Sequence, residues 1–510
     1  MKQLVEALFA PCTWLIAVIT ILSFILLVRL SLDAKLILAL PNGSPKHWAA
    51  YHLPLLGSAL PFFRRRRDML AEGQGLVTNG NFSFFIGSKH IVNLGSLQGR
   101  RTFFESKNLS VSQGAIELLV GLVSANDDLE DSAAQDFIKS LLPLTRPAML
   151  ASKISVLTDD IHLFCRNLLL STPSESRPNW RVMNPFESVY FLTSKLIMRV
   201  IGVSEWAEDE KLMNHIISCF YKFENNCSRA RIVFPGLVTY THLKKLFYGA
   251  LLWRGITEVV QQRKAGKRRD DAVQFVLDQD KDAIRFTFSI LSSGITTEGC
   301  SASWLTVFLA HSPEWQAKCR AEVHGVIAQK RGTSSQSADS ILGKLSLEEW
   351  EGSFPVIMAA IRETVRLAMP GAMVRKNASG SAVSIGQTSE VIPDGAYACF
   401  LIDNVHMDPG LYPDPYGFNP ERYLVRKSGL EEPEPHTYVG WGSGRHLCPG
   451  MRLAKLEISM VIAHLLAHFE FEPSDGKGCK LREPLPLVDR NEYRLKKPKG
   501  TVYIRYRPRE

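Results

Sequence analysis

Cysteine is scarce in this chain, with nine residues among 510, and none of the nine has a C-x-x-C partner. This spacing argues against a disulfide-stapled scaffold, so the ordinary expectation for any one cysteine is a buried apolar thiol. The sequence also lacks a nucleic-acid-binding motif, an internal repeat and a Gly-rich dinucleotide fingerprint. The excess of positive charge is small, with 60 Lys and Arg against 51 Asp and Glu, a net charge of +9. Such an excess suits an acidic protein or an anionic membrane better than sequence-specific DNA binding.

The composition that is present is that of a globular protein, with 45% hydrophobic and 9% aromatic residues. The length allows either three ordinary domains or one large domain. Short β-like runs occur near 82–95, 381–400 and 500–506. Apolar residues recur at helical spacing in about 115–169, 186–221, 237–263, 284–312, 314–330, 353–368 and 451–469. We therefore predict a mainly α-helical fold with small β-sheets, formed by one large domain.

The segment from Ala7 to Val28 contains no charged residue, and its 22 residues would span about 33 Å as a helix. A cleaved signal peptide is the alternative, but it would have a shorter apolar stretch and a small-residue cleavage site. Arg29, Lys35 and four arginines at 64–67 follow the apolar run. The positive-inside rule therefore predicts an N-terminal membrane anchor with the rest of the chain in the cytosol.

The densest cluster of special residues is 441–450, WGSGRHLCPG, which precedes an apolar helical run. Glycines allow close backbone approach to a flat ligand, and the position of Cys448 before a helix N-terminus favours its thiolate. Such a cysteine suits an axial metal ligand. Ser443 lacks the two glycines that a G-x-S-x-G nucleophile elbow needs, and a zinc site would need more ligands than His446. A buried structural cysteine stays the alternative.

This loop resembles that of the cytochrome P450 family of haem-thiolate monooxygenases, which reads F-x-x-G-x-R-x-C-x-G. Gly444, Cys448 and Gly450 match the pattern. Three further family elements precede the loop in the expected order, namely S-G-I-T-T at 293–297, E-x-x-R at 363–366 and P-E-R-Y at 420–423. The resemblance covers about 40–508 and is closest to microsomal members from secondary metabolism in filamentous fungi. It implies a cytochrome P450 fold after one transmembrane helix, and haem b whose iron is bound by the Cys448 thiolate.

The resemblance makes Thr297 the oxygen-side threonine, whose hydroxyl would hold a water that relays protons. A helical threonine bonded to its own backbone is the alternative. The sequence departs from the family at the preceding acidic position, which is Thr296. The nearby carboxylate is Glu298, one residue and about 100° further round the helix. Thr297 and Glu298 are therefore the candidate catalytic residues, and the missing acid puts the usual acid–alcohol pair in question.

Glu363 and Arg366 are spaced to share one face of an apolar helix. Buried charges need partners, and the resemblance supplies a third member, Arg422. We expect these three residues to form a structural network that fixes the cysteine loop. A solvated helical pair is the alternative for Glu363 and Arg366 alone.

Further cofactor contacts follow from the resemblance. Arg375 lies where the family often places a cation for a haem propionate, although a surface role or its neighbour Lys376 is the alternative. His446 takes the arginine position of the loop, and Trp441 replaces the usual phenylalanine. The residues expected to bind the cofactor are Cys448, Arg375, His446, Trp441, Gly442 and Gly450.

The resemblance implies three segments, which are a membrane anchor at 1–30, a proline-rich hinge at 31–62 and a haem-thiolate catalytic domain at 63–510. It also implies a single-pass protein of the endoplasmic reticulum membrane with its catalytic domain in the cytosol. The expected activity is oxidation of a lipophilic small molecule of terpenoid, steroid or polyketide type in natural-product biosynthesis. The expected partners are O2 and an NADPH-dependent flavoprotein reductase. Three alternatives stay open: a haem-thiolate isomerase without a reductase, a sterol-processing demethylase or hydroxylase, and a non-enzymatic haem-binding or scaffolding membrane protein.

Overall fold

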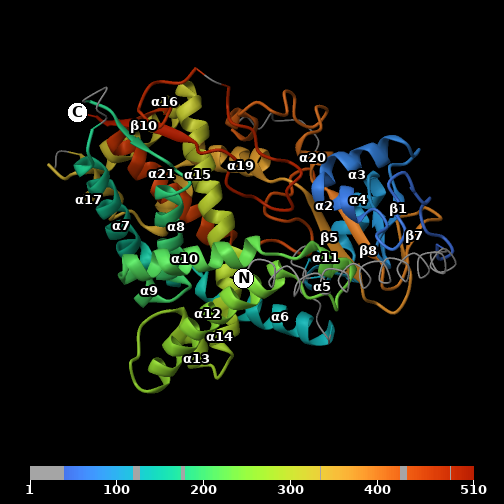
Figure 1. Cartoon of the computed structure of the whole chain (residues 1–510). Helices are drawn as coiled ribbons and strands as arrows, with labels where there is room; N and C mark the ends of the chain where they lie inside the picture. Colours follow the sequence, from blue (N-terminus) through green and yellow to red (C-terminus); the bar gives the residue numbers. More distant parts are fainter. Residues whose placement is uncertain are drawn as a thin grey trace, which may run out of the picture. The chain divides into compact units, whose positions relative to one another are not determined.

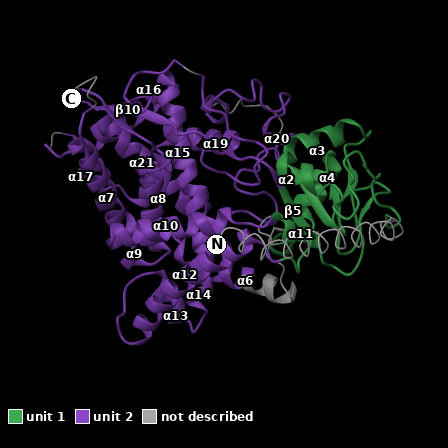
Figure 2. Cartoon of the chain, in the orientation of Figure 1, with its two compact units in different colours: residues 1–123, 229–237, 373–401 green, residues 124–228, 238–372, 402–510 purple. Residues whose placement is uncertain are grey.

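The computed structural model describes residues 40–115, 117–118, 127–173, 179–332, 335–424, 434–482 and 484–509. The predicted membrane anchor at 1–30 lies outside these ranges. Within them, no helix combines the length and the apolar character needed to cross a membrane. The chain divides into two compact units, which are coloured separately in Figure 2. Unit 1 comprises 1–123, 229–237 and 373–401, and unit 2 comprises 124–228, 238–372 and 402–510.

Unit 1 is built on a five-stranded sheet in the order β1-β2-β8-β5-β3, and a two-stranded sheet joins β6 to β7. The strands are β1 (Phe82–Ile86), β2 (Lys89–Asn93), β3 (Leu109–Ser110), β5 (Ala372–Asn377), β6 (Val383–Ser384), β7 (Val391–Ile392) and β8 (Tyr397–Leu401). The helices are α2 (Ala59–Arg64), α3 (Arg66–Gly75), α4 (Leu97–Glu105), α5 (Val111–Ala115) and α11 (Arg229–Val233). Part of the predicted hinge packs into this unit, because the Trp48 N–H donates to the Ser83 carbonyl at 2.8 Å and Phe62 is fully buried.

Unit 2 is mainly helical and contains a three-stranded sheet in the order β4-β10-β9. Its strands are β4 (Arg181–Met183), β9 (Phe469–Ser474) and β10 (Tyr503–Pro508). Its first helices are α6 (Asp127–Leu144), α7 (Pro147–Leu170), α8 (Ser188–Val200), α9 (Ser204–Glu208), α10 (Glu210–Asn225), α12 (Tyr240–Lys264), α13 (Ala272–Leu277) and α14 (Ala283–Ile290). They are followed by the π-helix η2 (Leu291–Ile295), α15 (Thr296–His311), α16 (Pro313–Arg331), α17 (Ala338–Leu342), α18 (Leu347–Gly352), α19 (Pro355–Ala368), α20 (Asp403–His406), the 3-10 helix η3 (Pro420–Tyr423) and α21 (Met451–His468).

Helix α15 lies at the centre of unit 2, where it contacts α8, α19 and α21 (Figure 1). Every residue from Glu298 to Ala310 is buried, so this helix has no solvated face along most of its length. The prediction of a mainly helical fold with small sheets is confirmed. The predicted helical region 115–169 is interrupted before Pro147, because Arg146 is extended and proline disfavours the helical conformation of the residue before it.

Candidate active site

The loop before α21 presents Cys448 through a tight backbone turn. Gly442 has φ +74°, and a Cβ atom at this position would overlap the carbonyl oxygen of His446. The Gly442 N–H donates to the Val439 carbonyl at 3.0 Å, and the Cys448 N–H donates to the Trp441 carbonyl at 2.8 Å. A side chain at position 442 would therefore disrupt the loop that holds the cysteine.

The thiol of Cys448 is accessible, yet protein atoms surround it closely. Desolvation raises its pKa, and the charge of Glu298 adds to this effect. The backbone amides of Gly450 and Met451 form hydrogen bonds with the sulfur and lower its pKa. Burial prevails, so the pKa is raised overall in the protein alone. The sulfur is thus reachable by a ligand and already faces amides at the start of a helix, which favour an anion.

Glu363 and Arg366 of α19 form a fully buried ion pair with two contacts. Arg366 Nε donates to Glu363 Oε2 at 2.8 Å, and Arg366 Nη2 donates to Glu363 Oε1 at 2.8 Å. Arg422 of η3 adds a hydrogen bond from its Nε to Glu363 Oε1 at 3.2 Å. The Asn419 N–H also donates to Glu363 Oε1, at 3.1 Å. The structure therefore brings together the three residues that the sequence analysis grouped.

This network reaches the cysteine loop through His406, which the sequence analysis missed. Arg366 Nη1 donates to the His406 carbonyl at 2.6 Å and to the Pro415 carbonyl at 2.7 Å. The Val439 N–H donates to His406 Nε2 at 3.0 Å, directly before the loop. Burial lowers the pKa of His406 well below its usual value, so the neutral ring accepts this hydrogen bond. The charged network thereby fixes Val439, two residues before the loop begins.

A short π-helix interrupts the α-helical region that carries Thr297. The π-helix η2 separates α14 from α15 and ends one residue before Thr296. Ser292, Ser293 and Thr297 are exposed, whereas Thr296 and Glu298 are buried. Among the described residues, the Thr297 hydroxyl has no hydrogen-bond partner, which argues against the alternative of a threonine bonded to its own helix. Unit 2 therefore carries both the accessible thiol of Cys448 and the accessible hydroxyl of Thr297, which follows the π-helix.

Comparison with known proteins decides the family. The sequence model described as Cytochrome P450 matches residues 182–496. The chain belongs to the cytochrome P450 family. The protein named cytochrome P450 monooxygenase AacuE, from Aspergillus aculeatus, is 30% identical over 94% of this chain and 93% of its own length. Cytochrome P450 monooxygenase dmxR5 from Cryptosporiopsis sp. is 26% identical over 83% of this chain and 82% of its own. Carnosic acid synthase from Rosmarinus officinalis is 23% identical over 86% of this chain and 88% of its own.

This P450 is accordingly a monooxygenase, and its family carries haem with an axial cysteine thiolate. The observed loop fits that group, because the Cys448 sulfur is accessible, surrounded by protein and contacted by two amides. Of the other predicted cofactor residues, Gly442 closes the turn and Gly450 donates its amide to the sulfur. Trp441 is half-buried against the hydrophobic core, and His446 is exposed.

Arg375 belongs to unit 1, where its guanidinium is buried without a carboxylate partner among the described residues. It lies 4.4 Å from the Phe103 ring centroid and donates to the Phe103 carbonyl. Desolvation lowers its pKa to about 10. The neighbouring Lys376 forms an ion pair with Glu117 at 3.2 Å, so its charge is already compensated. A buried unpaired cation fits an incoming anion such as a propionate, and this role of Arg375 stays a prediction.

Glu298 and Glu457 of α21 are both buried, and their charges interact, although neither carboxylate oxygen of Glu457 has a hydrogen-bond partner among the described residues. Burial raises the pKa of Glu298 to about 7 and raises that of Glu457 well above its usual value. Two interacting buried carboxyls do not both carry a charge at neutral pH, so at least one of them is protonated. Glu298 is therefore not on the exposed face that carries Thr297. Its predicted catalytic role would require a proton path around the helix.

The sequence analysis missed Glu457, although a signal for it exists. It is an acidic residue within the otherwise apolar core-facing run of α21, nine positions after Cys448. Such a residue indicates a buried partner on the neighbouring helix. Its partner could not be named from the sequence, because the rotation of α15 against α21 decides which side chain meets it.

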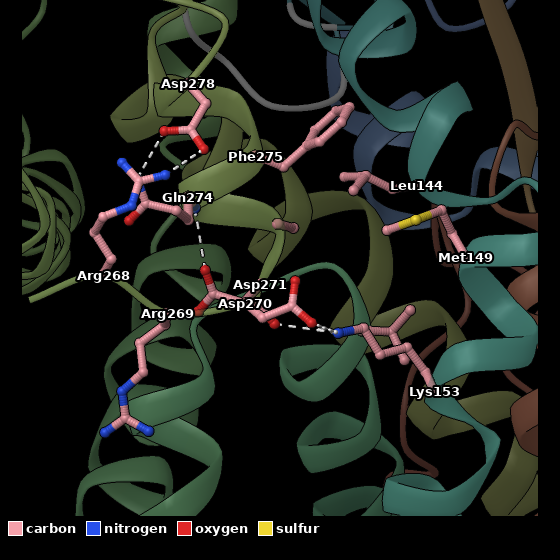
Figure 3. A pocket seen from close by; sticks show the side chains of 12 residues that line it. Leu144, Met149, Lys153, Arg268, Arg269, Asp270, Asp271, Gln274, Phe275 and Asp278 are labelled. Carbon is pink, nitrogen blue, oxygen red and sulfur yellow. Dashed lines mark hydrogen bonds and ion pairs between the residues drawn. The ribbon is translucent and has the colours of Figure 1, made fainter.

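A separate hollow lies beside α7 and α13 in unit 2 (Figure 3). Two ion pairs lie within it: Arg268 Nη2 contacts Asp278 Oδ2 at 2.7 Å, and Lys153 Nζ contacts Asp270 Oδ2 at 3.5 Å. It contains none of the motif residues. These internal pairs leave no reason to assign a ligand to this hollow.

Proposed function

We propose that this monooxygenase oxidises a lipophilic small molecule of terpenoid, steroid or polyketide type, in natural-product biosynthesis. The observation that carries the proposal is the accessible Cys448 thiol in the same unit as the accessible Thr297 hydroxyl. The substrate class is supported by fungal relatives named cytochrome P450 monooxygenases and by a plant relative named carnosic acid synthase. Because these relatives are named as monooxygenases or a synthase, they favour oxidation over a non-enzymatic scaffold.

Different residues of the chain bind the cofactor, hold the cysteine loop and position a proton donor. When bound, haem supplies oxygen activation that no amino acid side chain provides. Cys448 would hold the iron through its sulfur, whose charge the amides of Gly450 and Met451 stabilise. The Glu363–Arg366–Arg422 network keeps the loop in place through His406. The Thr297 hydroxyl would hold a proton donor beside the site.

Electrons would come from NADPH through a separate flavoprotein reductase, because no dinucleotide fingerprint occurs in residues 1–510. Basic residues around the cysteine loop support an acidic docking partner. Arg445 is exposed in the loop, whereas Arg452 already pairs with Glu351, with Nη2 at 2.7 Å from Oε2. Arg445 is thus the better candidate for contact with the reductase.

Thr297→Ala should separate electron use from product formation. With reductase and substrate, the wild type should consume NADPH, consume O2 and form product in equal amounts. Loss of the hydroxyl removes a positioned proton donor, so product per NADPH should fall about 10²-fold while NADPH consumption continues. Thr241→Ala on the exposed face of α12 is the control and should couple normally. Unchanged coupling in Thr297→Ala would contradict the assigned role, and product formation without O2 uptake would contradict the proposed function.

We also propose a single-pass protein of the endoplasmic reticulum membrane with its catalytic residues in the cytosol. The uncharged run at 7–28 supports the anchor. Helix α12 also exposes an apolar band that suits contact with an apolar surface. Its members are Tyr240, Leu243, Leu246, Phe247 and Trp253.

Alkaline extraction of microsomes that contain the full chain tests this location. The chain should stay in the membrane pellet, because a spanning helix resists the wash. Protease added outside the microsomes should digest the part from residue 40 onward. Release into the wash, or protection of that part from protease, would contradict the proposal.

A further inference from the structure

The acid missing from α15 has a counterpart on a different helix. Thr296 takes the position where the P450 resemblance places an acidic residue. Its Oγ1 donates a hydrogen bond to Oε2 of Glu224 at 2.7 Å, and the contact is buried. Glu224 lies in the last turn of α10, 72 residues earlier in the chain. A carboxylate therefore sits one hydrogen bond from the position where the sequence lacks one.

Glu224 is held in a polar cluster within unit 2. Its side chain is 6% exposed, and it forms an ion pair with Arg494, whose side chain is 23% exposed. Tyr190 of α8 forms a hydrogen bond with Thr296 from another direction. Burial raises the pKa of Glu224, although Arg494 opposes this shift. The titratable and charged groups that act on the cluster are Arg494, Lys245, Tyr190, Tyr493, Cys227, Cys300 and Lys497.

We propose that Glu224 is the carboxylate of the proton relay in this enzyme, and that it acts through Thr296 toward Thr297. The proposal rests on the proposed function, since a relay matters only where oxygen is activated. Glu224 is a positioning residue, because it touches Thr296 and not the reacting atoms. The π-helix η2, which ends directly before Thr296, widens the backbone where a water could link the two threonine hydroxyls.

The relay balances in protons alone. Solvent supplies one proton to the Glu224 carboxylate, with Arg494 at the partly exposed end of the cluster. Thr296 receives a proton from Glu224 and releases its own hydroxyl proton to the water beside Thr297, and this water passes one of its protons on to the oxygen being reduced. Each oxygen of the relay ends with the number of bonds that it had, and no electron moves through the relay.

Glu298 does not compete for this role. Its carboxyl is buried, and its charge interacts with that of Glu457 on α21. A purely structural ion pair between Glu224 and Arg494 would fix the C-terminal segment but would not need the Thr296 hydroxyl. The function of that hydrogen bond therefore separates a relay from a structural pair.

Thr296→Val is the sharpest variant, because it keeps the side-chain shape and the Glu224–Arg494 pair while removing the hydroxyl. Product per NADPH should fall about tenfold, less than the 10²-fold typical of a direct proton donor, with KM unchanged. Glu224→Gln should show the same loss. Glu210→Gln, on the exposed start of α10, is the matched control and should couple normally.

The rescue variant Thr296→Asp/Glu224→Gln returns the acid to α15. Coupling should recover in this double variant, a result that a structural role of Glu224 would not produce. Infrared difference spectra of wild type against Glu224→Gln isolate the Glu224 carboxyl band without turnover. That band should shift in frequency in Thr296→Val, because the hydrogen bond is lost.

Each variant is first reduced and exposed to carbon monoxide. A thiolate-type spectrum in the wild type and all variants shows that the proposed function stands, so that any loss of coupling belongs to the relay. Normal coupling in Thr296→Val, absence of rescue in the double variant, or an unshifted Glu224 band would overturn the inference. A wild type without the thiolate-type spectrum would instead overturn the proposed function.

Discussion

Cys448→Ser should abolish monooxygenation while the protein still folds. The cysteine is accessible, so its replacement by a residue of similar shape should change the free energy of unfolding by less than about 0.5 kcal/mol. Serine cannot supply the thiolate that the iron needs. The rate of product formation should therefore fall by more than the roughly 10- to 100-fold loss seen when a residue that only orients a metal ligand is removed.

Cys479→Ser is the matched control for this result. Cys479 is also exposed and lies in the same unit, but it is outside every motif. We expect full activity and an unchanged haem spectrum in this variant. Substantial turnover by Cys448→Ser, or equal losses in both variants, would contradict the assignment of Cys448.

Arg366→Ala should be the most destabilising single substitution in the Glu363–Arg366–Arg422 network. It leaves the fully buried Glu363 carboxylate without its main partner and removes the donors to the His406 and Pro415 carbonyls. Removing one partner of a buried ion pair costs about 3–5 kcal/mol in the free energy of unfolding. Urea unfolding measures this loss, and haem content after expression should fall because the loop loses its anchor at Val439.

Arg254→Ala serves as the control for that experiment. Arg254 forms an exposed ion pair with Glu258 on α12, and such pairs contribute little to stability. Its unfolding midpoint and haem content should match those of the wild type. A stable Arg366→Ala protein with normal haem content would show that the loop is held by other contacts.

Features of the fold that depend on local sequence patterns were predictable. Helical periodicity located α12, α16, α19 and α21 within a few residues, because each buries one stripe or all of its surface. The strand β9 was not separated from the end of α21, since its alternation is short and follows the helix without a break. The division into two compact units could not be predicted from the sequence, because unit 1 combines three segments that are distant in the chain.

Features of the site divide in the same way. Motif spacing was enough to group Glu363 with Arg366 and Arg422, and the structure joins them at Glu363 Oε1. Glu224 and His406 could not be found, because each contacts the site only through long-range hydrogen bonds and lies in no motif. The side of α15 that faces Glu457 also could not be predicted. Adjacent helix residues point in directions about 100° apart, and packing decides which of them is buried.

The central claim is that Cys448 is the thiolate ligand of a haem iron. The absorbance spectrum of the reduced, carbon monoxide-bound full-length protein tests it most directly, measured beside Cys448→His. We expect the wild type to show the haem band at the longer wavelength that a thiolate ligand produces, and Cys448→His to show the histidine-type band. A wild-type spectrum with only the histidine-type band would contradict the account.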